Sequence, residues 1–415
     1  MAREMKDSGI EWFRKIPVNW KKVAIKRLFE IGRGRVIATT ELSDFGYPVY
    51  SSQTKNNGVL GYIDTYDYDR SQLTWTTDGA NAGTVFLREG KHNCTNVCGT
   101  LMPISETEND LRFLKYIVSF TAFYHKRADI NGFKIMNNEM AEIIIILPPL
   151  KEQHRIADFL DNQCAHIDSV IEKTRSAIEE YKKLKQAVIT QAVTKGIRPN
   201  REMKDSGIEW FPVIPMEWTV SRVGLHYDII LGKMLCQNQL NNDYTLEPYY
   251  CAANVHFDGV SNTDLKQMWF STAEKEQYLV KEVDLLVVEG GAGAGGSAIV
   301  VSVDKPTYVQ NSVMIVRPKN TSNNCYLRYL LEFLVKEGYI EVACNKATIP
   351  HFTKDKLANV PYLVSNEQSE IVAYLDEKTA AIDSLVQKKE QLITELEAYK
   401  KSLIYEYVTG KKEVV

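Results

Sequence analysis

Side chains that can each form two hydrogen bonds are common in the loop-like segments of this sequence. Arginine, lysine, asparagine and glutamine in such segments can make bidentate contacts with purine edges in the major groove of DNA. The candidates in the first half are Arg33, Arg35, Gln53, Lys55, Asn57, Asn81, Asn131 and Lys134. The candidates in the second half are Lys233, Gln237, Asn254, His256, Asn345 and Lys346. The alternative for each segment is a solvated turn, and a net charge of −3 argues against tight phosphate binding by this chain alone.

No segment of the sequence has the pattern of a catalytic centre. The run 291–296 formally satisfies GxGxxG, but a strand-like run follows it where a dinucleotide site needs a helix. A tight turn between two strands explains these glycines better. Asp78 with Glu89 and Lys91 has the spacing of a nuclease site, but the second half has no counterpart. We therefore expect no catalytic residue, no metal site and no cofactor in this chain.

Cysteine usage and hydropathy predict a cytoplasmic protein without a membrane segment. The seven cysteines have scattered spacings, which suit reduced thiols better than a disulfide framework. Cys94 and Cys98 form one CxxxC pair with no second pair nearby, so buried thiols are a simpler interpretation than zinc ligands. The N-terminus is charged, and the longest apolar stretch, 143–147, is far too short to span a membrane.

The elements that position these side chains come in two copies. The run REMKDSGIEWF occurs at 3–13 and again at 201–211, which is 198 residues later (201 − 3). Later in each copy the offset becomes 215 (367 − 152). Other matched pairs are Ile16 with Ile214, Trp20 with Trp218, 147–150 with 360–363, Glu152 with Glu367, and Ile167-Asp168 with Ile382-Asp383. Matched ends and different middles indicate a shared frame that carries two variable inserts.

Each copy ends in a predicted long amphipathic helix. Mainly apolar residues from 160 to 192 recur at alternating spacings of four and three, with no proline or glycine between them. This heptad spacing places them in one stripe, or seam, along a helix, and an equivalent seam runs from 375 to 407. Lys185 and Lys400 interrupt the two seams at equivalent positions. A seam of this length spans about 50 Å of helix, more than one small domain can cover. We therefore expect the two helices to pack antiparallel on each other. The alternative is two independent helices, each covering its own domain.

The inserts have the pattern of mixed domains. Both contain short apolar runs separated by turn signals, then a glycine-rich turn and a late helix, near 110–123 and 324–336. The predicted fold is α+β, with two mixed α/β domains joined by two long antiparallel coiled-coil helices in an internal pseudo-twofold repeat. The predicted parts are a first domain with its arm at 1–150, a first long helix at 151–198, a second domain with its arm at 199–365, and a second long helix at 366–415.

This doubled frame resembles the specificity subunit of type I restriction-modification systems. The resemblance rests on KDSGIEWF with Ile-Pro-x-x-Trp at 6–20 and 204–218, on LPPLKEQ at 147–153, and on the long helix with Ile167-Asp168. It implies a non-catalytic, DNA-binding subunit whose two target recognition domains each read one half of a bipartite, asymmetric target. The helix pair would set the spacer between the halves. The competing interpretations are a scaffold or adaptor with two protein-binding domains, and a degenerate nuclease.

The resemblance also implies partners. Two modification subunits would dock on the frame and carry S-adenosylmethionine and adenine methylation, and two restriction subunits would add ATP- and Mg-dependent translocation and cleavage. We expect docking to use the repeated arm, including Trp12, Trp20, Trp210 and Trp218, together with the outer helix faces. The alternative is that these tryptophans anchor each arm to its own domain.

Overall fold

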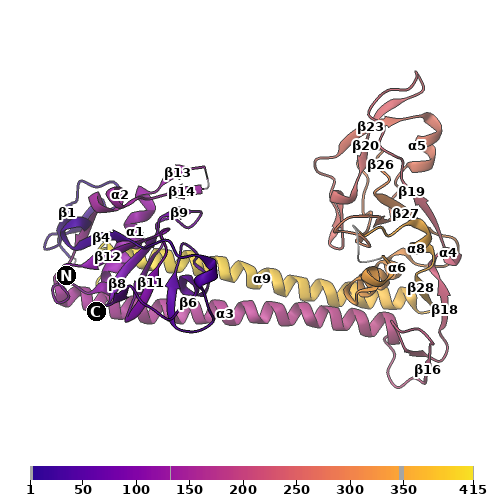
Figure 1. Ribbon diagram of the computed structural model, residues 1–415. Coiled ribbons are helices and arrows are strands. Elements are labelled where there is room, and N and C mark those ends of the chain that lie inside the picture. The colour runs from indigo at the N-terminus through magenta and orange to yellow at the C-terminus, as the bar shows by residue number, and fades with distance from the viewer. Residues whose placement is uncertain (1–2, 131, 345–349, 415) are drawn as a thin grey trace. The chain divides into compact units, whose positions relative to one another are not determined.

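The structure is a computed structural model that describes residues 3–130, 132–344 and 350–414, and it consists of two compact units. Unit 1 contains Met1–Arg175 and Glu390–Val415, and unit 2 contains Ser176–Lys389. The long helices α3 (Leu150–Lys195) and α9 (Gln368–Val408) are therefore each shared between the units (Figure 1). Each unit has one insert, the start of its own long helix and the end of the other one.

Unit 1 is built around two four-stranded sheets and a helix. The first sheet is antiparallel, in the order β10 (Val85–Arg88), β8 (Gln72–Thr76), β12 (Cys98–Pro103) and β4 (Phe29–Arg33). The second has the order β6 (Val59–Ile63), β5 (Tyr47–Tyr50), β11 (Lys91–Cys94) and β7 (Tyr68–Asp69), with β5 and β11 parallel. Helix α1 (Leu111–His125) buries Phe113, Leu114 and Ile117 in the core that the first sheet shares with α3.

Smaller elements of unit 1 hold the arm and one group of loops. β1 (Met5–Asp7) and β2 (Lys15–Pro17) form a hairpin in the arm, and β3 (Lys21–Ala24) pairs with β15 (Ile144–Leu147). A three-stranded sheet consists of β13 (Arg127–Asp129), β14 (Gly132–Lys134) and β9 (Asp78–Gly79). The short helix α2 (Asn137–Glu142) follows this sheet. Strand pairing thus brings the segments near 78 and 127–134 together, far apart as they are in sequence.

Unit 2 repeats this plan with longer loops. Its antiparallel sheet has the order β19 (Tyr227–Leu231), β27 (Val313–Pro318), β24 (Leu285–Val288) and β25 (Ser297–Ile299). A second sheet contains β23 (Lys266–Phe270), β20 (Thr245–Tyr250) and β26 (Tyr308–Val309), and α6 (Asn324–Lys336) is the late helix. The glycine-rich run 291–296 joins the antiparallel strands β24 and β25, which confirms the predicted turn. The two predicted late helices are confirmed as α1 and α6.

The remaining elements of unit 2 are short. Strands β16 (Met203–Asp205) and β17 (Val213–Pro215) form the arm hairpin, with the same register as β1 and β2. The other short elements are β18 (Thr219–Arg222), β21 (Val255–His256), β22 (Gly259–Val260), β28 (Pro361–Val364), α4 (Val223–His226), α5 (Thr272–Tyr278), α7 (Tyr339–Ala343) and α8 (Lys354–Ala358).

The structure corrects one of the sequence matches. Leu147 of β15 pairs with Lys21, and the equivalent partner of Thr219 is Val364 of β28. Leu147 therefore corresponds to Val364, and Pro148 follows its strand whereas Pro361 begins one. The similar letters at 147–150 and 360–363 do not occupy equivalent positions, because the two copies differ in the length of the connection into the long helix.

The long helices run antiparallel within each unit, as predicted. In unit 1, Lys400 Nζ lies 2.6 Å from the Asp168 carboxylate, and in unit 2, Lys185 Nζ lies 2.7 Å from that of Asp383. Adding 215 to Lys185 and to Asp168 gives Lys400 and Asp383, so each ion pair is the counterpart of the other. The lysines that interrupt the seams are thus each paired with an aspartate on the facing helix. Half-exposed pairs of this kind add little stability, but they favour one register.

Candidate nucleic-acid interface

In unit 1, loops from distant parts of the sequence meet around Asp78. Its carboxylate lies 3.0 Å from Lys134 Nζ on β14 and 3.7 Å from Arg33 Nη2 at the end of β4. Lys134 also lies 3.4 Å from Asp129, and Arg33 donates to the Thr77 hydroxyl at 3.4 Å. Two residues that the sequence analysis singled out separately, Arg33 and Lys134, therefore share one carboxylate.

The charges in this cluster compensate one another. Burial by itself raises the pKa of Asp78, but hydrogen bonds from Thr77 and Lys134 and the charge of Arg33 outweigh burial and hold this pKa below its ordinary value. The hydrogen bond to Asp78 raises the pKa of Lys134. Both groups are therefore charged at neutral pH. Two cations and two carboxylates make a cluster with little net charge, which is better suited to hold the loops in place than to attract phosphate.

A second loop, 51–58, is attached to the segment that follows β9. Asn81, which follows β9, donates to the Thr54 hydroxyl at 3.2 Å, and Gln53 donates to a main-chain carbonyl at the end of its own loop. Asn57 has a φ of 50°, a left-handed conformation that asparagine tolerates better than most residues. The side chains of Lys55 and Asn57 are exposed, and neither has a hydrogen-bond partner among the described residues. These two side chains are thus available to a ligand.

Arg35 and Lys233 occupy equivalent positions in the two units. The main-chain N–H of Arg35 donates to the Cys94 carbonyl at 3.1 Å, and that of Lys233 donates to the Val309 carbonyl at 3.0 Å. In both units a glycine precedes the cation, and a Cβ on it would lie less than 2.5 Å from a main-chain oxygen of the neighbouring strand end. The close approach of two backbones therefore explains the Gly-Arg and Gly-Lys pairs of the sequence.

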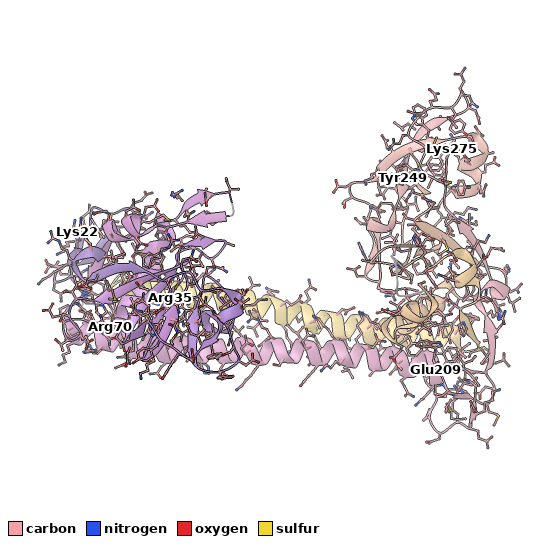
Figure 2. The ribbon with its side chains drawn as sticks, in the orientation of Figure 1. Lys22, Arg35, Arg70, Glu209, Tyr249 and Lys275 are labelled. Carbon is pink, nitrogen blue, oxygen red and sulfur yellow. The ribbon has the colours of Figure 1, made fainter. Side chains whose placement is uncertain are left out.

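Both cations are neutralised within their own units. The Arg35 guanidinium, labelled in Figure 2, lies 3.0 Å from Asp67 and 3.7 Å from Glu41. Lys233 is buried, forms an ion pair with Glu274 and lies over the ring of Tyr244. The structure therefore corrects the expectation for Lys233: its ammonium group is internal and does not reach a surface ligand.

The other residues predicted in the second half have different environments. Asn254 is buried, and its side-chain oxygen accepts from the Cys251 N–H at 3.0 Å, so it stabilises a turn and is a second correction to the predicted DNA contacts. Gln237 and His256 are exposed and remain candidates. Asn131, Asn345 and Lys346 lie outside the described residues.

The repeated residues of the frame form an Arg–Glu–Trp clamp in each unit. In unit 2, the Glu367 carboxylate accepts from Trp218 Nε1 at 2.8 Å and from Arg201 Nη1 at 2.5 Å. In unit 1, Glu152 accepts from Trp20 Nε1 at 3.1 Å and lies 2.6 Å from Arg3. The clamp joins each arm to the beginning of its own long helix. Each glutamate lies more than 130 residues from the tryptophan that it binds, and the repeat was the only sequence signal of their association.

The four tryptophans of the arms fall into two classes. Trp20 and Trp218 are 1% and 0% exposed, so their rings are internal and serve as anchors. This is the alternative that the sequence analysis left open for them. Trp12 and Trp210 are half-buried. The ring of Trp12 stacks on that of Tyr124, with 5.4 Å between the ring centres, and Trp210 contacts Tyr339 edge-on, with 5.3 Å between the ring centres. Only these two tryptophans have ring surface left for a partner.

The long helices also repeat a Leu-Asp pair, Leu160-Asp161 and Leu375-Asp376, and the structure gives the reason for it. The Asp161 carboxylate accepts from the Tyr116 hydroxyl at 2.7 Å in unit 1, and Asp376 accepts from Tyr329 at 2.7 Å in unit 2. Burial and the neighbouring carboxylate raise the pKa of Tyr116, and burial raises the pKa of Tyr329 to about 12. Both phenols therefore keep their protons at neutral pH and donate them, which attaches α1 and α6 to the long helices.

Two observations limit the chemistry of the described residues. In residues 3–130, 132–344 and 350–414, no three histidine, cysteine, aspartate or glutamate side chains are placed to hold a metal ion together. Asp78 is bound to Lys134 and Arg33, whereas Lys91 lies over the ring of Tyr66, so the residues whose spacing resembles a nuclease site do not come together.

No helix in the described part of the chain is both long and apolar enough to span a membrane.

Sequence relatives point to one family. The model of the type I restriction modification DNA specificity domain matches this chain twice, at 17–180 and at 215–395. A putative type I specificity subunit N-terminus of Mycoplasma pneumoniae is 40% identical over 145 residues, which cover 34% of this chain and 76% of that protein. The specificity subunit of the type I restriction enzyme MpnII from the same organism is 39% identical over 140 residues, 33% of this chain and 41% of that subunit. The match thus spans less than half the length of that relative.

Two solved structures share the fold. A chain from a structure on complex assembly and conformational transition of a type I R-M system has a TM-score of 0.70 at 18% identity, with 95% of this chain and 98% of that chain covered. The HsdS subunit of Thermoanaerobacter tengcongensis has a TM-score of 0.53 at 17% identity, with 96% and 98% covered. Because the family model matches most of the sequence in two copies, the chain belongs to the family of type I restriction-modification DNA specificity domains.

Proposed function

We propose that this chain is the DNA sequence-specificity subunit of a type I restriction-modification complex. Each insert would read one half of a bipartite, asymmetric target, and the antiparallel helices would set the spacer between the halves. One observation supports the proposal most strongly. The frame is repeated in the sequence while the loops of the two inserts differ, and the model of the DNA specificity domain matches the chain twice. A frame made twice can hold two readers in a fixed relation, and readers that differ can recognise two different half-sites.

The catalytic steps would belong to other subunits. We infer that two modification subunits bind the frame and supply S-adenosylmethionine and adenine methylation, and that two restriction subunits supply ATP- and Mg-dependent translocation and cleavage. The small net charge of −3 fits this division, because most of the phosphate contacts would then come from the partners. A gel shift on duplex DNA, with and without the modification subunit, tests the proposal. Specific binding only with that subunit supports it, and no binding in either case favours a protein-binding scaffold.

The loop 51–58 supplies the first specific test. Replacing Lys55 by Ala and Asn57 by Gly removes the two free side chains, and glycine preserves the left-handed backbone at 57. Each lost base contact is expected to cost about 1–3 kcal/mol and to relax one position of one half-site. Sequencing the methylated sites made by the assembled complex measures the effect. Gln237→Ala in unit 2 is the control, since it should affect only the other half-site. If the loop variant methylates the original target unchanged, this loop does not read DNA.

The arm supplies the second test. We expect the Trp12→Ala and Trp210→Ala double variant to lose both modification subunits on co-purification, because each ring has a half-exposed face in the repeated part of the frame. The Trp12 indole N–H is also buried without an acceptor among the described residues, and a docked partner could supply one. Val36→Ala with Val301→Ala is the control, since these side chains are 74% and 86% exposed on the inserts. A folded double variant that still forms the 2:1 assembly excludes this docking role.

A further inference from the structure

Aromatic side chains gather at the C-terminal end of α1 in unit 1. The ring of Trp12 stacks on that of Tyr124, with 5.4 Å between the ring centres. Phe120 lies 5.3 Å from Tyr124 and 5.5 Å from Tyr405 at the end of α9, measured between ring centres. Phe123 and Tyr124 are 62% and 47% exposed, and their rings contact each other. These five side chains form the aromatic surface of unit 1. An exposed apolar surface of this kind is typical of a protein contact.

Three cations lie at the aromatic surface. Lys126 Nζ lies 4.5 Å from the ring centre of Phe123, and Lys411 Nζ lies 3.9 Å from that of Tyr405. Burial and the charge of the nearby Arg14 both lower the pKa of Lys411. Among the described residues, no carboxylate lies within 4.0 Å of any of these three cations. Cations without a counter-charge favour an acidic ligand.

Two buried polar atoms of the same surface also lack a partner. Trp12 Nε1 and His125 Nε2 have no hydrogen-bond partner among the described residues, and the two rings meet edge-on with 4.9 Å between their centres. The indole N–H is a donor, and His125 Nε2 donates in one of its two tautomers. A buried donor without an acceptor costs free energy. A carboxylate from a partner would supply an acceptor for these donors and a counter-charge for the cations.

The equivalent place in unit 2 is identified by contacts that recur. Tyr116 and Tyr329 donate to equivalent aspartates of the long helices, and Asp110 and Asn323 cap the starts of α1 and α6. Both pairs have the same offset of 213 (329 − 116 and 323 − 110). Adding 213 to a position in α1 therefore gives its counterpart in α6, while the offset of 215 relates α3 to α9.

Unit 2 replaces three of the five rings by polar residues. The replacements are Lys336 for Phe123 (123 + 213), Glu337 for Tyr124 (124 + 213) and Thr190 for Tyr405 (405 − 215). Thr190 and Glu337 line a groove of about 390 Å³, at the place that the rings of Tyr405 and Tyr124 fill in unit 1. The aromatic surface of one unit is therefore a polar groove in the other.

The charges of the two places differ as well. Arg14 and Pro212 accept main-chain hydrogen bonds from the equivalent serines of the two arms, at 2.7 and 2.9 Å, so a proline replaces Arg14 in unit 2. Lys183 and Lys195 bring cations to the groove of unit 2, but the exposed Glu337 lines it too and repels an acidic ligand. The arms are identical at 3–13 and 201–211, so the two units differ in what surrounds the arms.

We propose that the aromatic surface of unit 1 binds an acidic, partly apolar segment of the modification subunit, and that the first modification subunit to join the complex occupies unit 1. The inference rests on the proposed function, in which two copies of that subunit dock on the two arms. Both copies present the same segment, which meets exposed rings in unit 1 and a polar groove with a carboxylate in unit 2. Buried aromatic anchors supply much of the affinity of an interface, so the copy on unit 2 binds more weakly.

A protein segment suits the aromatic surface better than a nucleic acid does. Single-stranded nucleic acids bind by stacking their bases on free ring faces. Here Lys126 covers one face of Phe123, Lys411 covers one face of Tyr405, and the rings of Trp12 and Tyr124 are stacked on each other. The exposed ring edges that remain favour apolar side chains of a protein.

Titration of the full chain with the modification subunit, followed by native mass spectrometry, tests the proposal. We expect a 1:1 complex first, and a 2:1 complex only at about tenfold higher concentration or more. Phe123→Glu, at an exposed position, should raise the Kd of the tighter step at least about tenfold. Lys336→Glu places the same side chain at the equivalent position of unit 2 and should weaken only the second step. Two equal steps in the unmodified chain, or a tighter step that persists in Phe123→Glu, overturn the proposal.

A transplant of the rings gives a test in the opposite direction. Thr190→Tyr, Lys336→Phe and Glu337→Tyr together copy the aromatic surface into unit 2, at positions that are exposed or half-buried, and should bring the two Kd values within about threefold of each other. An unchanged second step would show that the rings do not determine affinity. Single-stranded DNA that binds the chain and is released by Phe123→Glu would assign the surface to nucleic acid. Absence of both binding steps would overturn the proposed function itself, whereas two equal steps overturn only this inference.

Discussion

Lengthening both long helices by four residues is expected to lengthen the unread spacer of the DNA target by about one or two base pairs, and to leave both half-sites unchanged. Four residues add about 6 Å of helix, and duplex DNA rises 3.4 Å per base pair. Sites for the insertions follow from the ion pairs Asp168–Lys400 and Arg175–Glu397. An insertion after Lys173 in α3 and another after Ala398 in α9 both fall between these pairs, so both pairs are preserved.

Sequencing of the methylated sites decides this prediction. The control replaces Glu172 and Lys173 by alanine, which changes the same stretch of α3 without lengthening it, and it should keep the original spacer. An insertion in α3 alone moves Arg175 away from Glu397, and it should therefore fold and assemble less well than the double insertion. A double insertion that folds and methylates with the original spacer would show that the helices do not set the distance between the half-sites.

Replacing Glu367 by alanine is expected to destabilise unit 2 by about 3–5 kcal/mol. The side chain is 1% exposed and compensates Arg201, which is itself only 10% exposed, and it accepts the Trp218 N–H. Its removal leaves the nearly buried Arg201 with only the half-exposed Glu217, 2.8 Å away, and leaves the buried indole N–H of Trp218 without an acceptor. Thermal or chemical unfolding followed by tryptophan fluorescence measures the effect.

The matched control for Glu367 is Glu370, three residues later and in the first turn of α9. Its carboxylate is 57% exposed and lies 3.1 Å from Arg198, so Glu370→Ala should cost no more than about 1 kcal/mol. Glu367→Gln keeps an acceptor for Trp218 and should fall between the two. Equal stability of Glu367→Ala and Glu370→Ala would refute the clamp as a source of stability.

The frame was predictable from sequence because it occurs twice. Identity between the copies identified Trp20 with Trp218 and Glu152 with Glu367 before any contact was known, and the structure joins them in the same way in both units. The long helices were predictable for a different reason, because heptad spacing is a local pattern that fixes which face is buried. All of these signals could be read within one copy or between the two copies.

The environments of the loop residues were not predictable in this way, because the two inserts share a fold but their loop sequences do not match. Lysine and asparagine are residue types usually found in surface loops, yet Lys233 and Asn254 are both buried. The partner of Lys233 is Glu274, 41 residues later, and only the fold brings the two together. The same holds for the buried Arg88 of β10, which gave no signal in the sequence because its contacts come from residues 14 to 38 positions away on other strands and loops. Polar residue type alone therefore does not separate a DNA contact from an internal ion pair.

The division of the long helices between the units has a consequence for the order in which the chain folds on the ribosome. Unit 2 is one continuous segment, Ser176–Lys389, and all of it is available once residue 389 has emerged. Unit 1 is made first, but its core includes Leu403 and Val408, which are 5% and 0% exposed. At ~5–20 residues per second, the apolar surface of unit 1 that these residues cover stays open for about 1–4 seconds after unit 2 can close. The N-terminal half of the protein is thus the half completed last.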